Sequence, residues 1–478
     1  MRAAVAVFIG LAALAAVLAV LFRQAGPDDG PSPAPRPSSP PAVAVTVDAA
    51  RPGRTVPRAF LGLATEWDSV APYARARRAL RPLLAPLRTH FGAPVTLRVG
   101  GDTGDQMWWN PSRRRPRPRT VLQDVTPATL RDVRQLAQAL GGAPVTLGVN
   151  LALDDPQNAA ALVRAAQRTL PRGALEAVEI GNEPDFFARP ERRWTVPGHR
   201  HLRVRKFATY TAADYGRVTA RYLRALTRDV PAPRPQLVAG GFAGPGWWPA
   251  LGDLMRTWPV RPDAVAGHLY ALPQCERPTP APAWLMAARQ SDGAAARLRP
   301  LAQLATHARV PLRVSELNSA ACGGRPGVSD APAAALWTAD ILFALLSEGA
   351  ERANLQTWQH ARYAPFDVAD DGIVTRRPPL DGLEAFARAA PAGSRLLATR
   401  SADTATVRAR ATLDARTGTV RTLLLAPRAA TVRLDAPCTR AWLATPRGRR
   451  TLTPRRALGG TCTLTLPAAS LAVVTGPR

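Results

Sequence analysis

Short apolar runs alternate with amphipathic helical segments along most of the chain. The apolar runs have the length of buried strands and lie at residues 59–65, 95–99, 145–150, 177–180, 236–239, 264–267, 312–315 and 353–357. Apolar positions recur with helical spacing between them, for example at residues 129–140, 158–170, 212–226 and 332–347. Eight β–α alternations of this size predict an α/β fold, a (β/α)8 TIM barrel. A doubly wound open sheet is the alternative.

The pattern changes near residue 393. Short alternating runs at residues 406–411, 419–425, 431–434, 462–466 and 471–474 are separated by Pro and Gly turns, which is typical of an antiparallel β-sandwich. Another short alternating strand, at residues 43–47, has no partner in a barrel, so we assign it to the sandwich. The predicted units are therefore an N-terminal strand at residues 42–55, a catalytic barrel at 56–377 and a C-terminal sandwich at 378–478.

The N-terminus begins with a continuous apolar segment. Residues 3–22 follow Met1-Arg2 and are long enough to span a bilayer, but they also fit a signal peptide. No convincing small-x-small cleavage motif follows, which favours a membrane anchor. We assign residues 1–24 to this segment and the Pro-rich residues 25–41 to an extended linker. Either interpretation places the remaining chain outside the cytoplasm, secreted or anchored to the membrane.

The chain is strongly basic, with a formal net charge of +28 and a pI of about 11.5. Lys206 is the only lysine among 63 basic residues, and Ala and Pro are abundant, a pattern typical of GC-rich coding sequences. The positive charge therefore has two alternative explanations, a compositional bias and a preference for an acidic partner. Because no basic run is interleaved with aromatic residues, we do not predict nucleic-acid binding.

Four cysteines follow the predicted export segment. An even number in that context favours disulfides. Cys438 and Cys462 bracket one pair of C-terminal strands, so we pair them; Cys275 and Cys322 each follow a predicted barrel strand, which makes a second bridge plausible. No CxxC or histidine spacing supports a zinc site, and we predict neither a metal nor an organic cofactor.

Two of the predicted strands end in a glutamate. One ending is Gly181-Asn182-Glu183-Pro184, and the other places Glu316 within Ser315-Glu-Leu-Asn318. Enzymes that hydrolyse glycosidic bonds use two carboxyl groups, one protonated as an acid and one ionised. Because barrel active sites lie at the C-terminal ends of the strands, these two side chains are expected to share one rim.

Further polar side chains follow the other predicted strands, which also favours a barrel over an open sheet. They are Glu66, Arg98, Asp102, Asn150, His268, Tyr270, Trp358 and Tyr363. Acids and amides bind sugar hydroxyls, and aromatic rings cover the apolar faces of a sugar. We expect Asn182 to bind the sugar 2-hydroxyl, Arg98 and Tyr270 to hold Glu316 ionised, and His268 to support it.

Several motifs together resemble glycoside hydrolase family 79, the β-glucuronidase and heparanase group of the retaining (β/α)8-barrel clan. The matching segments occur in family order between about residues 56 and 365: 60–67 (FLGLATEW), 97–102 (LRVGGD), 181–185 (GNEPD), 268–270 (HLY), 315–319 (SELNS) with Gly323-Gly324, and 327–330 (GVSD) leading to Leu336-Trp337. Asn-Glu-Pro alone is typical of the whole clan, whereas the ordered set is more specific.

The resemblance implies roles for individual residues. Glu183 would be the general acid/base and Glu316 the nucleophile. The family binds a uronate carboxylate through a Gly-Gly loop and a tyrosine after the last strand, here Gly323, Gly324 and Tyr363. The polar strand-end residues Glu66, Asp102, Asn150 and Tyr270 would complete the substrate site.

The expected function is retaining hydrolysis of a β-linked glycoside, most simply one containing glucuronic acid. A clan relative acting on neutral sugars is one alternative. A catalytically inactive glycan-binding barrel at the cell surface is another, and a tethered structural envelope protein attracted to acidic polymers is a third. For the expected enzyme and for the first two alternatives the partner is a glycan or glycoside. The resemblance to family 79 implies an acidic one.

Overall fold

The computed structural model describes residues 40–190, 192–196, 199–203, 206–273, 281–287, 290–436, 438–456 and 461–478. Residues 3–22, expected to be an anchor or a signal peptide, lie outside these ranges, as does Cys275 of the second expected disulfide. Among the described residues, no helix combines the length and apolar character needed to cross a bilayer. All elements below belong to one compact unit, Ala42–Arg478.

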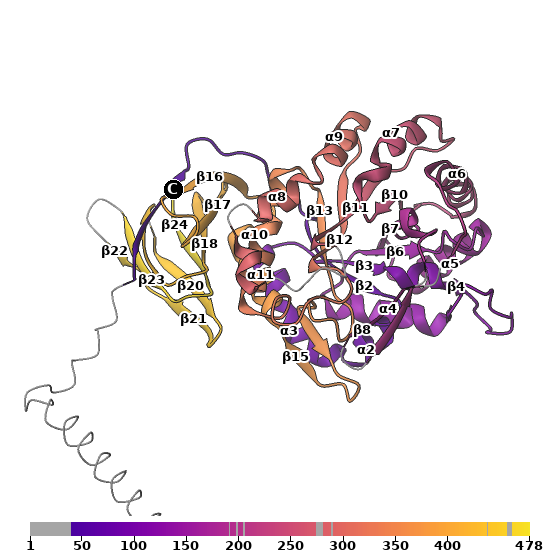
Figure 1. Ribbon diagram of the computed structural model, residues 1–478, viewed down its shortest axis with the longest axis horizontal. Helices are drawn as coiled ribbons and strands as arrows, with labels where there is room; N and C mark the ends of the chain where they lie inside the picture. The colour runs from indigo at the N-terminus through magenta and orange to yellow at the C-terminus, as the bar shows by residue number, and fades with distance from the viewer. Residues whose placement is uncertain are drawn as a thin grey trace, which may run out of the picture. The chain divides into compact units, whose positions relative to one another are not determined.

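Eight parallel strands form a closed barrel, which confirms the predicted fold class (Figure 1). They are β2 (Leu61–Glu66), β3 (Thr96–Gly100), β6 (Val145–Val149), β7 (Leu175–Ile180), β10 (Gln236–Phe242), β11 (Ala264–Leu272), β12 (Leu312–Ala320) and β13 (Arg352–Gln356). Each strand pairs with the next one in this order, and β13 pairs with β2 to close the ring. Nearly every residue in these strands is buried, because side chains inside and outside the barrel are both covered.

Helices surround the barrel strands (Figure 1). They are α2 (Val70–Arg75), α3 (Arg77–Phe91), α4 (Pro127–Ala139), α5 (Pro156–Thr169), α6 (Ala212–Asp229), α7 (Trp248–Thr257), α8 (Gln290–Ala296), α9 (Arg299–Ala308), α10 (Pro332–Ser347) and α11 (Pro378–Ala389). The start of α4 shows why the sequence forms a helix there: Thr126 and Thr129 make a capping box, and Pro127 occupies the first turn.

Helix α11 packs against the barrel. The Phe386 ring contacts the rings of Phe60, Phe91 and Phe343, with centroid distances of 5.4, 6.5 and 5.3 Å. The expected domain boundary after residue 377 falls just before this helix, although its buried side chains join the barrel core. Amphipathic periodicity identifies such a helix but does not say which layer it covers.

In the described part of the chain, ten further strands form a second, predominantly antiparallel sheet, as the predicted fold class requires. In spatial order they are β21 (Gly448–Leu452), β20 (Arg440–Thr445), β24 (Ser470–Pro477), β18 (Thr419–Ala426), β17 (Arg408–Asp414), β16 (Arg395–Ser401), β1 (Ala42–Asp48), β19 (Ala430–Asp435), β23 (Cys462–Leu466) and β22 (Arg455–Arg456). The N-terminal strand β1 lies between β16 and β19, parallel to β19. Apolar residues from both halves of this sheet share one core. A disulfide joins Cys438 to Cys462, the pair predicted from the sequence.

The sequence pattern did not reveal β16 and β22, and it gave no separate ranges for β20 and β21, which lie between Cys438 and Cys462 where one pair of strands was expected. In β21 the first four residues are exposed, so the strand has no alternation of apolar and polar positions to detect. Pairing with β20 alone defines it as a strand. A strand that is exposed along most of its length therefore carries little period-two signal.

Further short elements lie in the loops of the barrel. They comprise the pairs β4 (Met107–Trp109) with β5 (Gln123–Val125), β8 (Arg192–Val196) with β9 (His199–Arg203), and β14 (Phe366–Val368) with β15 (Val374–Arg376), and the 3-10 turns η1 (Asp102–Gln106), η2 (Pro184–Phe186), η3 (Pro245–Trp247) and η4 (Pro282–Met286). The turns η1, η2 and η3 follow β3, β7 and β10, so they border the rim that carries the expected site.

A buried ion cluster connects the barrel to the second sheet. Asp340, fully buried on α10, accepts hydrogen bonds from Arg408 Nη1 (2.7 Å) and Arg410 Nε (2.8 Å) of β17. Burial by itself raises the pKa of Asp340, but the two guanidinium groups outweigh it, and the pKa lies below its ordinary value. The carboxylate is therefore ionised wherever the two arginines are in place.

We expect the substitution Asp340→Asn to lower the free energy of unfolding by about 3 kcal/mol, because it leaves the buried Arg408 without a counter-charge, while Arg410 keeps Asp292. Urea unfolding at neutral pH measures the loss. Since the folded-state pKa is depressed, the difference from wild type is full above the unfolded pKa of about 4 and shrinks as the pH falls below it. Asp253→Asn, which breaks an exposed ion pair with Arg256, is the control and should change stability little. A loss no larger than that of the control would contradict the prediction.

Candidate active site

A cavity of about 320 Å³ opens at the C-terminal ends of the barrel strands. Residues from most of the strand ends line it: Glu66, Asp102, Glu183, Phe186, Arg189, Ala243, Gly244, Pro245, Trp248, His268, Leu269, Tyr270, Pro273, Arg297, Leu298, Glu316, Ala321, Cys322, Gly323, Trp358 and Tyr363. The two glutamates expected to perform catalysis therefore face the same cavity. The position of this cavity follows from the fold, since parallel strands bring all their carboxyl ends to one rim.

Glu183 is held in an unusual backbone conformation just beyond β7. Its φ and ψ are 46° and 52°, in the left-handed region, which costs a residue other than glycine about 1–2 kcal/mol. The preceding Gly181 also has positive φ, and a side chain there would meet Leu151. The Glu183 amide donates to Gly241 O at 2.9 Å, and its carbonyl accepts from Phe186 N at 2.8 Å. Pro184 then begins η2, so the turn directs the carboxyl group into the cavity.

Glu316 is positioned by a bulge in β12. The pairing of β12 with β11 skips Ser315, because Gly267 lies opposite Val314 and His268 lies opposite Glu316. The extra residue breaks the alternation of side chains, so Ser315 and Glu316 both contact residues of the buried polar network. This irregularity places a carboxylate where a regular strand would turn it away.

Two donors hold the Glu316 carboxylate. Arg98 Nη1 lies 2.6 Å from Oε1, and the Tyr270 hydroxyl donates to Oε2 at 2.8 Å. Both contacts were expected from strand position. Hydrogen bonds of this kind are short and fix the orientation of the carboxylate.

Glu179 completes the network, and the sequence analysis did not identify it. It accepts from Arg98 Nε at 2.9 Å and from the Ser315 hydroxyl at 2.9 Å. Burial by itself raises the pKa of Glu179, but Arg98 and His268 reverse the effect and hold it at about 2. The available signal was a fully buried position for Glu179 in a mostly apolar strand, where a charge is rare unless it is paired.

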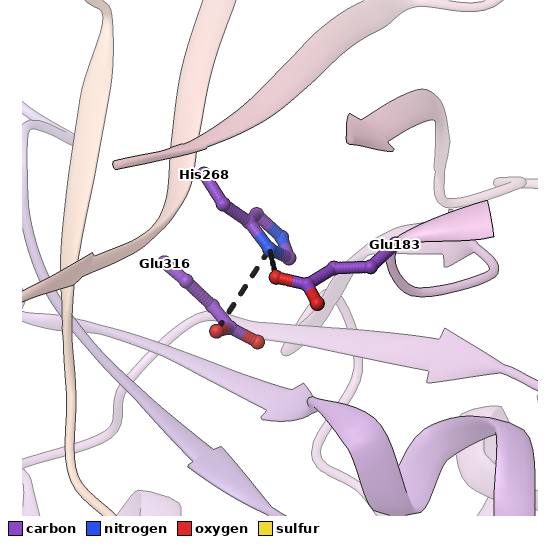
Figure 2. Close-up of side chains that lie close together, drawn as sticks. All are labelled: Glu183, His268 and Glu316. Atoms are coloured by element: carbon purple, nitrogen blue, oxygen red, sulfur yellow. Dashed lines mark hydrogen bonds and ion pairs between the residues drawn. The ribbon is translucent and has the colours of Figure 1, made fainter. Parts of the chain in front are cut away.

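His268 lies between the carboxylates (Figure 2). Its Nδ1 atom is 3.0 Å from Glu183 Oε1 and 3.8 Å from Glu316 Oε2, and its Nε2 atom is 3.9 Å from Glu179 Oε1. Burial by itself lowers the pKa of His268, but Glu316, Glu179 and Glu183 outweigh it and raise the pKa to about 10. The ring is therefore an imidazolium at neutral pH, close to both rim glutamates.

The same three residues also have the composition of a metal site. One carboxylate oxygen of Glu183, one of Glu316 and a ring nitrogen of His268 lie within 4.8 Å of one another. A histidine ligand must be neutral, whereas the pKa of His268 is raised to about 10. In addition, the Arg98 guanidinium lies 2.6 Å from Glu316 and would repel a cation. The donors fit proton chemistry better than metal binding.

Glu66 and Asp102 line the cavity beside the two glutamates. Glu66 accepts hydrogen bonds from Thr103 N at 2.9 Å and from Gln356 Nε2 at 3.0 Å. Burial, and then the charge of Glu316, raise the pKa of Glu66 well above its ordinary value. Asn182 does not line the cavity but lies behind it, where its Oδ1 accepts from Arg98 Nη2 at 2.9 Å.

Two other expected substrate-binding residues lie elsewhere. Asn150 does not line the cavity: its amide group donates to Met107 O at 2.6 Å and accepts from Leu153 N at 2.9 Å, which ties two loops together. Of the two loop glycines only Gly323 lines the cavity, because the Gly324 amide donates to Ala321 O at 3.2 Å. Tyr270 and Tyr363 both line it, with ring centroids 6.2 Å apart.

The cavity wall also contains residues that the sequence pattern did not identify. Phe186 and Arg189 follow Glu183, and Arg297 follows α8. They lie in loops or at helix ends, where apolar periodicity gives no direction for a side chain. The Arg189 guanidinium lies over the Phe186 ring at 3.6 Å.

We expect the contribution of His268 to stability to depend on pH. Its pKa is about 10 in the folded protein and about 6.5 in the unfolded chain, so the contribution is full below pH ~6.5 and is lost as the pH rises through the folded value. Urea unfolding of wild type and His268→Gln should therefore show a difference in unfolding free energy that is largest at mildly acidic pH and smallest in alkali. A difference that does not change with pH would show that the ring is neutral.

Comparison with known proteins supports the fold. No protein-family model and no curated protein matches the chain. Among the solved structures that share its architecture is a 4-O-α-L-rhamnosyl-β-D-glucuronidase from Fusarium oxysporum 12S, with 18% sequence identity and a TM-score of 0.67 over 91% of this chain and 100% of that chain. A GH51 arabinofuranosidase from Xanthomonas axonopodis pv. citri has 16% identity and a TM-score of 0.64 over 91% of this chain and 99% of that chain. A family 44 xyloglucanase from Paenibacillus polymyxa has 10% identity and a TM-score of 0.62 over 91% of this chain and 100% of that chain. At these identities the likeness concerns the fold, a barrel with an additional sheet domain.

Proposed function

We propose that the protein is a retaining glycoside hydrolase in which Glu183 is the general acid/base and Glu316 the nucleophile. The observation that carries the proposal is that the two glutamates face one cavity with carboxylate oxygens within 4.8 Å of each other. Retaining enzymes have their carboxyl groups about 5–5.5 Å apart, whereas inverting enzymes need about 6.5–9.5 Å to admit a water molecule. The short separation supports retention.

The surrounding contacts support a division of roles between the two glutamates. We assign Glu316, whose two oxygens are held by Arg98 and Tyr270, as the nucleophile that attacks the anomeric carbon while Glu183 gives its proton to the leaving oxygen. This step removes the negative charge from Glu316 and leaves one on Glu183. Water then completes the reaction with Glu183 as base. The His268 imidazolium, near both carboxylates, compensates the charge before and after this transfer.

For the sugar we propose a uronic acid, as the resemblance to family 79 implies. Gly323 and Tyr363 line the cavity, and so does Arg297, whose guanidinium has no carboxylate partner among the described residues. A cation on the wall of the sugar site favours an anionic substrate. Of the structural relatives, one is a rhamnosyl-glucuronidase and one is an arabinofuranosidase, so the fold alone does not choose between acidic and neutral sugars.

We place the protein outside the cytoplasm. The disulfide between Cys438 and Cys462 favours an oxidising compartment, and the apolar residues 3–22 fit an export signal or an anchor. A glycan or glycoside is then the natural partner.

We expect Glu183→Gln and Glu316→Gln each to lower kcat/KM for phenyl β-D-glucuronide by at least about 1,000-fold, because each removes one of the two groups that the reaction needs. NMR of the first-formed product should show the β-anomer. Circular dichroism and thermal unfolding should show that both variants remain folded. Full activity of either variant would refute the assignment, and an α-anomer would refute retention.

We expect Arg297→Gln to raise KM for phenyl β-D-glucuronide by about 10-fold, because the variant loses a charge-assisted contact with the carboxylate. Phenyl β-D-xyloside, which lacks that carboxylate, serves as the matched probe. If wild type hydrolyses the xyloside and not the glucuronide, the neutral-sugar alternative is correct.

A further inference from the structure

Lys206 is the only lysine among 63 basic residues, and it lies in the rim beside the candidate active site. Its side chain is 6% exposed, and its Nζ atom is 3.1 Å from Oδ2 of Asp105, which is completely buried. A compositional bias toward arginine explains most of the positive charges in this chain but not a buried lysine. The position therefore has a requirement that arginine does not meet.

Asp105 connects loops that follow three different strands. It lies in η1, after β3. Its Oδ1 atom accepts from Leu151 N at 2.9 Å, beyond β6, and its Oδ2 atom accepts from Asn182 N at 3.0 Å, beyond β7. Lys206 adds the cation that compensates this buried carboxylate.

The segment that begins at Lys206 also contacts the other side of the Glu183 turn. The amides of Lys206 and Phe207 both donate to Phe187 O at 3.2 Å. The ammonium lies 4.2 Å from the centroid of the Phe187 ring, and the rings of Phe187 and Phe207 stack at 5.9 Å. The turn is therefore fixed at Asn182 on one side of Glu183 and at Phe187 on the other.

A left-handed glutamate persists only where its surroundings hold it. We infer that Lys206 and Asp105 are positioning residues that hold the Asn182–Phe187 turn, so that the Glu183 carboxyl group can reach the leaving oxygen. This inference rests on the proposed function, in which Glu183 is the proton donor. Neither residue lines the cavity, so both act through the turn.

The geometry also explains why the residue is lysine. The Asp105 oxygens already accept backbone amides, so one donor direction remains for a cation. A compact ammonium can occupy it, whereas a planar guanidinium brings further donors that need acceptors of their own. Lys206→Arg should therefore impair the enzyme, although it keeps the charge.

The test compares two leaving groups. Phenol leaves slowly without a proton, whereas 2,4-dinitrophenolate leaves unaided, so misplacement of the acid affects only the first. We expect Lys206→Met, Lys206→Arg and Asp105→Asn to lower kcat/KM for phenyl β-D-glucuronide by about 10-fold or more and for the dinitrophenyl glucuronide by less than about 3-fold. An equal loss on both substrates, or none on either, would overturn the inference.

Arg221→Met is the matched control, because it breaks an exposed ion pair with Asp154 on a neighbouring loop. It should leave kcat/KM for both substrates unchanged, and wild-type turnover of the dinitrophenyl glucuronide tests the proposed function separately.

A second measurement does not depend on activity. Lysine-selective nitrogen-15 labelling gives a single side-chain ammonium signal in the NMR spectrum. The protons of this ammonium should exchange slowly with solvent in wild type and rapidly in Asp105→Asn. An unprotected ammonium in wild type would overturn the inference even if no glucuronide is hydrolysed.

Discussion

The buried guanidinium of Arg98 is the interaction on which the candidate site depends. It binds Glu179 through two nitrogens, Glu316 through a third contact and Asn182 through a fourth. Buried charges are tolerated only when they are paired and hydrogen-bonded, and the planar fork of arginine can satisfy several acceptors in a fixed geometry. One side chain of β3 therefore fixes the relative positions of groups on β7 and β12, and so the distance across which Glu183 and Glu316 face each other.

The charges around Arg98 constrain one another. Arg98 and His268 hold Glu179 ionised, and Glu316, Glu179 and Glu183 in turn raise the pKa of His268. The buried network thus pairs two cations, Arg98 and His268, with three glutamates. In the proposed double displacement Glu183 gives its proton to the leaving oxygen while Glu316 forms a bond to the anomeric carbon. The negative charge thus shifts from Glu316 to Glu183, and an imidazolium near both accommodates either state.

The backbone departs from regular geometry at both glutamates of the candidate site. The extra residue in β12 directs Ser315 and Glu316 into the same polar network. The left-handed conformation of Glu183 directs the second carboxyl group toward the first. Both features require support from outside the strand that contains them, which the loops after β3 and β6 and the Lys206 segment provide. A second charge cluster, Asp340 with Arg408 and Arg410, connects the barrel to the second sheet.

The sequence determined the barrel, the additional sheet and the two glutamates, because apolar periodicity and Gly or Pro at strand ends are local properties of the chain. It also predicted that Arg98, His268 and Tyr270 lie on the same rim as the two glutamates, since parallel strands place all their carboxyl ends together. Only the tertiary structure decided that Glu179 belongs to the network, that Asn150 and Gly324 are occupied by backbone contacts, and that Lys206 reaches Asp105. These depend on a strand bulge, on loop conformations and on contacts between residues far apart in the chain, none of which leaves a periodic trace in the sequence.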